Sequence, residues 1–354
     1  MKFSTQESPT LELALRVQKA RHAGRRVLSA STPGFPHRPM AIPAMQLDGR
    51  MASAEGNASC REQLAQTLFA RWSAQPEELV LTGGAKSALL CLVATLVPRA
   101  GRVACFTPAW PTYWSLAQAL GREPVLLPRR LATGWALETG EFSRLREGDA
   151  VVLSNPCNPT GRVYDAREIG ALATETERRG LWLLLDESFS ATASAAARFA
   201  EPVARLGERV VVVNSVSKNY LAQGWRLGAI LAAQSVRQAF EKVQTALVSP
   251  PAAPLQEMVH GVLRNPVDAD FIARRHAIAH ARLVAMNYEC TPAQGSFYLF
   301  PGRRGLAARA AQLEAQHDLY FLDGAAFGLD DPDYLRLCVL QPDGGLEVVL
   351  QALA

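Results

Sequence analysis

The chain has 354 residues, 49% of them hydrophobic, which is enough for a large buried core in two domains or one large α/β unit. The net charge of +4 is small and comes with no basic block, which argues against a nucleic-acid partner. No apolar run is long enough to cross a membrane, the N-terminus has no apolar signal-peptide core, and the six cysteines show no paired spacing. We therefore expect a cytoplasmic protein with free thiols.

The first 45 residues are expected to form an arm that contributes to a smaller, C-terminal domain. They hold one short predicted helix and then STPGFPHRP (31–39), whose prolines and Gly34 predict irregular backbone. The predicted division of the chain is an arm at 1–45, a large domain at 46–265 and a small domain at 266–354.

Seven short apolar runs follow, and they do not alternate with polar residues. They are ELVLT (78–82), RVACF (102–106), PVLLP (124–128), AVVLS (150–154), LWLLLD (181–186), RVVVVN (209–214) and RLGAILA (226–232). This pattern is typical of strands buried on both faces of a mostly parallel sheet. The segment 165–180 between two of the runs predicts a helix, with Asp165 and Glu168 as a capping box and Gly180 after its end.

Strands that alternate with helices predict an open, doubly wound α/β sheet covered by helices. In such a sheet the ligand site lies at the carboxyl ends of the strands. Beyond residue 265 one long helix (268–287) and three short strands (296–300, 319–322 and 334–340) predict the smaller α/β domain.

Chemically useful residues follow five of the buried runs, at the edge where a ligand would bind. GGAK (83–86) opens a helix after the first run, and the N–H groups at a helix start can bind phosphate. The segment 107–113 places Trp110 where an aromatic ring can stack on a planar ligand. SNPCNPTG (154–161) is a stiff loop that can point the amide of Asn158 inward.

Two further strand ends carry charged residues. Asp186 ends a leucine-rich run, where a buried carboxylate needs a partner. Ser215, Ser217 and Lys218 follow the run 209–214, and Arg226 comes eight residues after the lysine.

Lysine is rare in this chain, since it accounts for only five of the 37 lysines and arginines. A lysine amine can lose its proton and form an imine with an aldehyde, whereas a guanidinium cannot. The predicted site therefore suits a phosphorylated, protonatable aromatic aldehyde. It offers a phosphate-binding helix start, an aromatic ring, an amide, a buried acid and Lys218.

These motifs resemble those of a known family. SNPCNPTG, LDESF (185–189) and SVSKNYLAQGWRLG (215–228) are similar in order and spacing to the motifs of the class I/II aminotransferases, which are fold-type I pyridoxal-phosphate enzymes. The resemblance covers about residues 30 to 340. It implies a homodimeric enzyme that moves an α-amino group between an amino acid and a 2-oxo acid.

The resemblance also implies a role for each residue in holding pyridoxal 5′-phosphate. Lys218 forms the internal aldimine and shuttles a proton, and Asp186 keeps the pyridinium nitrogen protonated. Asn158 donates to the phenolic oxygen and Trp110 stacks on the ring. The phosphate is held by Ser215, Ser217, Arg226 and the backbone of Gly84, Ala85 and Lys86. Arg336 binds the substrate α-carboxylate, with Asn158 and Gly34 near it.

Two residues depart from the family pattern. Phe189 stands where the family has a tyrosine that donates to the phenolic oxygen, and Met51 stands where it has a tyrosine that reaches the partner subunit's phosphate. Both changes remove a hydroxyl from around the cofactor. They leave open a β/γ-lyase or cyclase of the same fold that acts on a modified amino acid.

A non-enzymatic alternative is a transcription regulator with an aminotransferase-like domain. Such regulators carry an N-terminal DNA-binding domain, whereas this chain enters the aminotransferase-like region almost directly, so we do not expect this function. The sequence does not identify the amino acid used. It offers no recognisable second arginine for a distal carboxylate, so acidic substrates are neither supported nor excluded.

Overall fold

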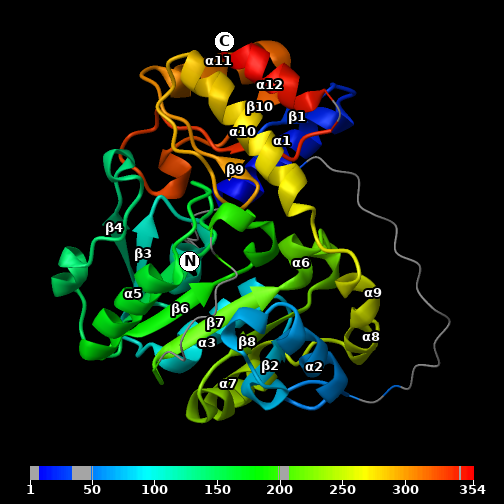
Figure 1. The fold of residues 1–354 in the computed structure, drawn as a ribbon, viewed down its shortest axis with the longest axis vertical. Coiled ribbons are helices and arrows are strands. Elements are labelled where there is room, and N and C mark those ends of the chain that lie inside the picture. The colour runs from blue at the N-terminus through cyan, green and yellow to red at the C-terminus, as the bar shows by residue number, and fades with distance from the viewer. Residues whose placement is uncertain (1–7, 34–48, 50, 198, 200–206, 343) are drawn as a thin grey trace, which may run out of the picture.

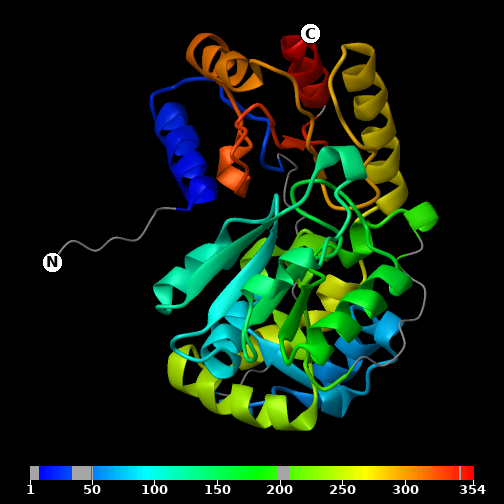
Figure 2. The same ribbon diagram turned by 90° about the vertical axis from the view of Figure 1, so that its left-hand side faces the viewer.

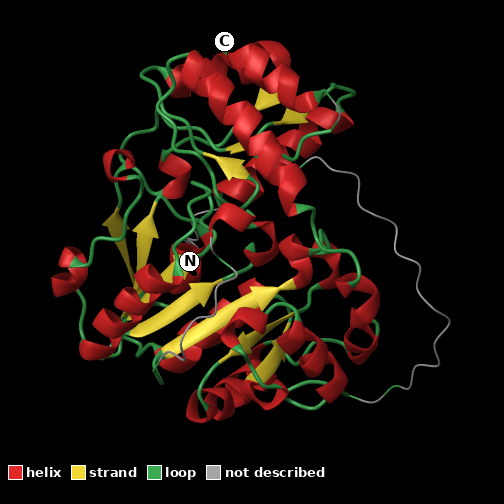
Figure 3. Ribbon diagram, in the orientation of Figure 1, coloured by secondary structure: helices red, strands yellow, loops and turns green. Residues whose placement is uncertain are grey.

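All seven apolar runs predicted as strands pair into one sheet in the computed structural model, which describes residues 8–33, 49, 51–197, 199, 207–342 and 344–354. The strands are β2 (Leu79–Thr82), β3 (Arg102–Thr107), β4 (Glu123–Pro128), β5 (Ala150–Ser154), β6 (Trp182–Asp186), β7 (Val210–Ser215) and β8 (Gly228–Leu231). Their order is β2-β8-β7-β6-β5-β3-β4. Only β8 in this sheet runs antiparallel to its neighbours, so the predicted mostly parallel sheet is confirmed (Figure 3).

Helices cover both faces of this sheet. They are α2 (Ala58–Gln66), α3 (Ala85–Leu96), α4 (Thr112–Ala119), α5 (Ala166–Arg178), α6 (Val216–Asn219), α7 (Gln234–Leu247), α8 (Ala253–Glu257) and α9 (Val259–Leu263). In β6, Leu183 and Leu185 pack with α2, α5 and α9 on one face, whereas Leu184 packs with α3, α4 and α7 on the other. Successive strand residues point to opposite faces, so apolar cores on both sides explain why the strand runs do not alternate.

The predicted boundaries of α5 are confirmed by its caps. The Asp165 side chain accepts a hydrogen bond from the Glu168 backbone, and the Glu168 side chain accepts one from the Asp165 backbone. Gly180 follows the helix with φ +67°, a conformation that favours glycine. The capping box and the glycine thus fix both ends of the helix.

A smaller unit lies above the sheet and contains segments from both ends of the chain (Figure 1). Its elements are α1 (Pro9–His22), β1 (Leu28–Ser29), α10 (Ala269–Ala285), β9 (Tyr298–Leu299), α11 (Leu306–His317), β10 (Leu319–Tyr320), β11 (Leu337–Cys338) and α12 (Gly345–Leu353). Strand β1 pairs with β10 in parallel, and β9 pairs with β11 antiparallel. Figure 2 shows α1 and the C-terminal helices grouped above the sheet.

The smaller unit differs from its prediction in the length of its strands. Each of the three predicted runs contains a strand, but each strand is only two residues long. The remaining apolar residues of these runs are buried in loops, where burial and not pairing accounts for their apolar character. The predicted domain limit at residue 45 lies outside the described residues, and the limit at 265 stays a prediction. None of the described helices is long and apolar enough to span a membrane.

Short 3₁₀ segments connect the elements. They are η1 (Ala70–Trp72), η2 (Pro76–Glu78), η3 (Leu131–Thr133), η4 (Gly140–Arg144), η5 (Ser190–Thr192), η6 (Ala195–Ala197), η7 (Gln223–Trp225) and η8 (Ala325–Phe327).

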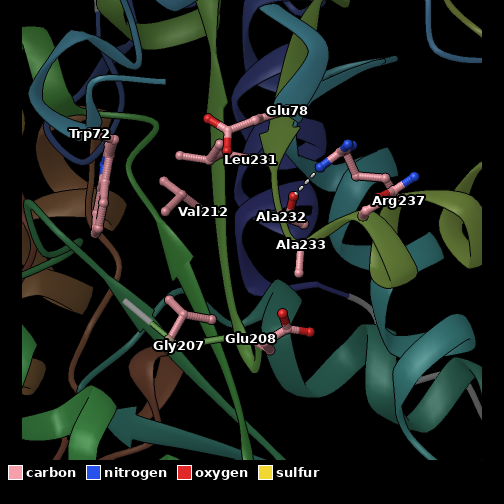
Figure 4. Close-up of a pocket in the computed structure, with 11 residues that line it drawn as sticks. Trp72, Glu78, Gly207, Glu208, Val212, Leu231, Ala232, Ala233 and Arg237 are labelled. Carbon is pink, nitrogen blue, oxygen red and sulfur yellow. Dashed lines mark hydrogen bonds between the residues drawn. The ribbon is translucent and has the colours of Figure 1, made fainter. Parts of the chain in front are cut away.

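Two cavities of about 580 Å³ lie toward opposite ends of β7. The one near the start of the strand has an apolar floor of Val212 and Leu231, a wall of Trp72, and the charged residues Glu208 and Arg237 among its lining (Figure 4). The other lies at the carboxyl ends of the strands, where the ligand site is expected.

Candidate active site

The cavity at the carboxyl ends of the strands contains most of the residues predicted to form the site. It is lined by Ala85, Lys86, Trp110, Asn158, Asp186, Phe189, Ser215, Ser217, Lys218, Arg226 and Arg336. Gly84 lies beside Arg226 at its edge. Thr32 and Pro33 line the cavity, but Gly34 itself lies outside the described residues.

Lys218 is held on α6, the short helix that follows β7. Behind it, the Asn219 amide donates to Asn214 Oδ1 at 2.8 Å and to the Ser215 carbonyl at 3.0 Å, while Asn219 Oδ1 accepts from the Ala191 backbone. These bonds fix the backbone that carries the lysine. Burial, followed by the positive charge of Arg336, lowers the pKa of Lys218 to about 8. Its amine is therefore a usable base near neutral pH.

Asp186 ends β6 with its side chain only 4% exposed. Burial raises the pKa of its carboxyl, and hydrogen bonds from Ser188 and Tyr113 oppose this rise. The Tyr113 hydroxyl donates to Asp186 Oδ2 at 2.8 Å, and the Ser188 backbone donates to Oδ1 at 3.0 Å. No described lysine or arginine forms an ion pair with this carboxylate, so a cationic partner would have to come from a ligand.

Tyr113 was missed in the sequence, although its spacing from Trp110 gave a signal. Trp110 and Tyr113 are three residues apart in the sequence, just before and within the start of α4. Their rings lie edge to face with centroids 5.5 Å apart. A phenol one turn after an aromatic at a strand end can reach across to another strand end. Here Tyr113 reaches Asp186 at the end of β6, which is separated from β3 by β5.

An anion-binding cradle lies at the mouth of the cavity, where α3 begins and Arg226 approaches it. Arg226 donates to the Gly83 carbonyl at 3.2 Å and reaches Ser217 Oγ at 3.4 Å. Gly84 has φ +85°, and a Cβ there would lie 2.8 Å from Arg226 Nη2. The positive φ favours glycine here, and its missing side chain lets the guanidinium approach the helix start, where backbone N–H groups and a fork-shaped cation could together bind an anion.

Arg336 connects the smaller unit to the loop that follows β5. Its Nη1 donates to Asn158 Oδ1 at 3.0 Å, and its Nη2 donates to the Ser31 carbonyl at 2.7 Å. The guanidinium is 2% exposed and lies over the rings of Tyr298 and Phe327, at 4.2 Å and 5.0 Å from their centroids. No described carboxylate pairs with it, and its buried Nε has no hydrogen-bond partner. It therefore suits a carboxylate ligand.

Arg129 was also missed, and it supports the site from behind. This buried arginine donates to the carbonyls of Phe106 and Pro108, before Trp110, and to the hydroxyl of Tyr164. It also reaches Cys157 Sγ at 3.4 Å. It thus ties the Trp110 loop to the loop that carries Asn158.

The charges in this cavity fit pyridoxal phosphate. Four cations (Lys86, Lys218, Arg226 and Arg336) line it, and Asp186 is the one acid among the described lining residues. An amine for the aldehyde, an acid for the ring nitrogen and a cradle for the phosphate are all present. No cluster of histidine, cysteine or acidic residues in the described part of the chain could hold a metal ion.

Comparisons with known proteins agree with this geometry. The family model of class I and II aminotransferases matches residues 1–353. A probable aspartate/prephenate aminotransferase of Aquifex aeolicus is 25% identical, over 93% of this chain and 91% of that protein. An aspartate aminotransferase of Geobacillus stearothermophilus is 26% identical, over 97% of this chain and 94% of that protein.

Solved structures show the same fold. The aspartate aminotransferase of Thermotoga maritima superposes with a TM-score of 0.84 at 22% identity, covering 99% of this chain and 96% of that one. The aspartate aminotransferase of Thermus thermophilus with maleate superposes with a TM-score of 0.82 at 20% identity. The match covers 99% of this chain and 97% of that one.

Lys218 should react with an amine-directed reagent as a base of unusually low pKa. In cofactor-free protein, acetylation of Lys218 followed by mass spectrometry should be half-maximal near pH 8, where half of the amines are neutral. An ordinary lysine has a pKa near 10.4. Arg336→Met should move the midpoint upward because it removes a repelling cation, whereas Arg16→Met, at the surface, should not. A wild-type midpoint above pH 10 would contradict this assignment.

Proposed function

The chain belongs to the class I and II aminotransferases and is a pyridoxal-phosphate-dependent transaminase, and we propose that Lys218, Asp186 and Arg336 carry out its reaction. The observation that carries the proposal is that these three residues, from different segments, meet in one cavity. The relatives and neighbouring structures are aminotransferases, so lyase or cyclase chemistry is not favoured.

The cavity residues divide into those that hold the cofactor and those that act on the substrate. When bound, pyridoxal phosphate supplies an aldehyde and an electron-withdrawing ring that stabilises negative charge on a substrate's α-carbon. Arg226, Ser217 and the start of α3 would hold its phosphate, with Ser215 beside them. Trp110 would lie against the ring. Phe189 offers an apolar ring in place of a hydroxyl.

Asp186 would partner the ring nitrogen as a carboxylate. Its bonds from Tyr113 and Ser188 leave it oriented and hydrogen-bonded, which favours the charged form against the effect of burial. Asn158 accepts from Arg336 through Oδ1, which leaves its Nδ2 available to donate to the cofactor's phenolic oxygen. Both side chains are therefore pre-oriented before the cofactor binds.

Lys218 and Arg336 act on the substrate. Arg336 binds the α-carboxylate through its guanidinium fork, so the α-carbon is brought to Lys218. The Lys218 amine, with a pKa of about 8, then takes and returns a proton at its Nζ, first from the α-carbon. The rings of Tyr298 and Phe327 pack against the Arg336 guanidinium and help to exclude water from it.

The half-reaction tests this function. Loaded enzyme given only an amino donor should release one equivalent of oxo acid per chain and stop, and a 2-oxo acid should restart it. Borohydride should fix the cofactor to Lys218, and Lys218→Ala should abolish both results. The proposal would be contradicted by continued turnover without an acceptor, or by cofactor fixed to Lys86 or Lys242.

We further propose that the preferred donor is an acidic amino acid. The named relatives include aspartate aminotransferases. Lys86 lies at the exposed mouth of the cavity, with Nζ 5.5 Å from the Trp110 ring centroid, and partial burial and Arg226 lower its pKa. Across the cavity, the buried Oγ1 of Thr10, in the first turn of α1, has no hydrogen-bond partner among the described residues. An ammonium and a free hydroxyl suit a second carboxylate.

Replacing Lys86 should therefore change substrate preference. Lys86→Met should lower kcat/KM for aspartate about tenfold or more, because one charged hydrogen-bond donor is lost. The value for leucine should stay within about threefold, as it has no second carboxylate. Steady-state kinetics on both donors checks this. An equal fall for both would mean that Lys86 serves the cofactor and not the substrate.

We also propose a cytoplasmic homodimer. All six cysteines are unpaired, which fits a reducing compartment. Met51, Leu247 and Val248 are 82%, 52% and 41% exposed, and a partner subunit would cover such apolar side chains. Sedimentation should give twice the chain mass, and Leu247→Asp should shift it toward one chain. A wild-type mass of one chain would exclude the dimer.

A further inference from the structure

Tyr298 lies on the same face of the β9–β11 pair as Arg336. Its Cα partner in the antiparallel register is Cys338, and Arg336 directly precedes β11, two residues before Cys338. Residues opposite each other, and those two apart, share one face of a strand pair. Both Tyr298 and Arg336 accordingly line the cavity above Lys218.

The Tyr298 ring is fixed by its neighbours. It is 3% exposed, and the Arg336 guanidinium lies 4.2 Å from its centroid. Phe189 and Phe297 pack edge to face against it, with centroids 5.9 Å and 6.2 Å away. A ring confined on these sides has one rotamer to offer a ligand, so its hydroxyl is pre-positioned.

The Tyr298 hydroxyl has no hydrogen-bond partner within the described part of the chain. Three other buried tyrosines do have one: Tyr113 donates to Asp186, Tyr164 to the Trp135 carbonyl, and Tyr288 to the Leu353 carbonyl. Buried phenols usually find a partner. Burial also raises the pKa of Tyr298 to about 12, so it remains a neutral donor at physiological pH. The Tyr298 hydroxyl is thus a hydrogen-bond donor beside Arg336, a cation with no described counter-ion, and this pair suits an anionic ligand.

We propose that the Tyr298 hydroxyl donates a hydrogen bond to the substrate α-carboxylate bound by Arg336, which makes Tyr298 a substrate-binding residue. This inference rests on the proposed role of Arg336. The carboxylate is favoured over the cofactor's phenolic oxygen because the ring packs on the guanidinium that would bind that carboxylate. The carboxylate then receives one fork-shaped cation from the segment just before β11 and one neutral donor from β9.

Binding of succinate, a dicarboxylate that cannot react, tests the inference without turnover. Calorimetry on the cofactor-loaded protein should show about tenfold weaker binding for Tyr298→Phe, which loses one hydrogen bond to a charged group. Tyr288→Phe, which removes a hydroxyl of the same unit far from the cavity, should bind succinate like wild type. The dissociation constant of pyridoxal phosphate should change less than twofold in both variants.

The outcomes separate this inference from the function it rests on. If Arg336→Lys weakens succinate binding but Tyr298→Phe does not, the Tyr298 inference is wrong and the carboxylate site stands. If Tyr298→Phe weakens binding of pyridoxal phosphate instead, the hydroxyl faces the cofactor and the inference is also wrong. If neither variant affects succinate, the carboxylate site itself is misassigned.

Discussion

Uncompensated positive charge is the constraint on which this site depends. Lys86, Lys218, Arg226 and Arg336 line a cavity in which Asp186 is the one acid among the described lining residues. Their repulsion is visible in Lys218, whose pKa falls through burial and through Arg336, Arg226 and Lys86 in turn. The cavity is therefore suited to anions, and we propose that a cofactor phosphate and a substrate carboxylate supply them.

The fold brings these charges together from distant parts of the chain. Parallel strands β5, β6 and β7 end at one edge, so Asn158, Asp186 and Lys218 follow them side by side. Arg336 comes from the smaller unit and reaches the same edge through its bond to Asn158. The site thus exists only when the two units meet, which links substrate binding to their relative position.

The sheet and the strand-end residues were predictable because each leaves a local pattern. Apolar runs marked all seven strands, and Asp186 and Lys218 were conspicuous as charges after such runs. The roles of three further residues could not be predicted from the sequence: Tyr113, Tyr298 and Arg129. A buried aromatic residue or arginine gives the same sequence pattern whether it packs in the core or binds a ligand. Their roles depend on partners distant in sequence, 73 residues for the bond of Tyr113 to Asp186 and 23 for that of Arg129 to Phe106, or on the pairing of β9 with β11 in the case of Tyr298. The proposed use of Lys86 for a second carboxylate likewise depends on Thr10, far from it in sequence.

The pKa of Lys218, measured with and without bound anions, tests the electrostatic account most directly. With ¹³C-labelled lysine the chain gives only five Cε signals, and Lys218→Arg identifies the relevant one. In cofactor-free protein the account predicts a titration midpoint near pH 8 that rises when inorganic phosphate and succinate bind, because they neutralise Arg226 and Arg336. A midpoint that stays in place while both anions are bound would contradict it.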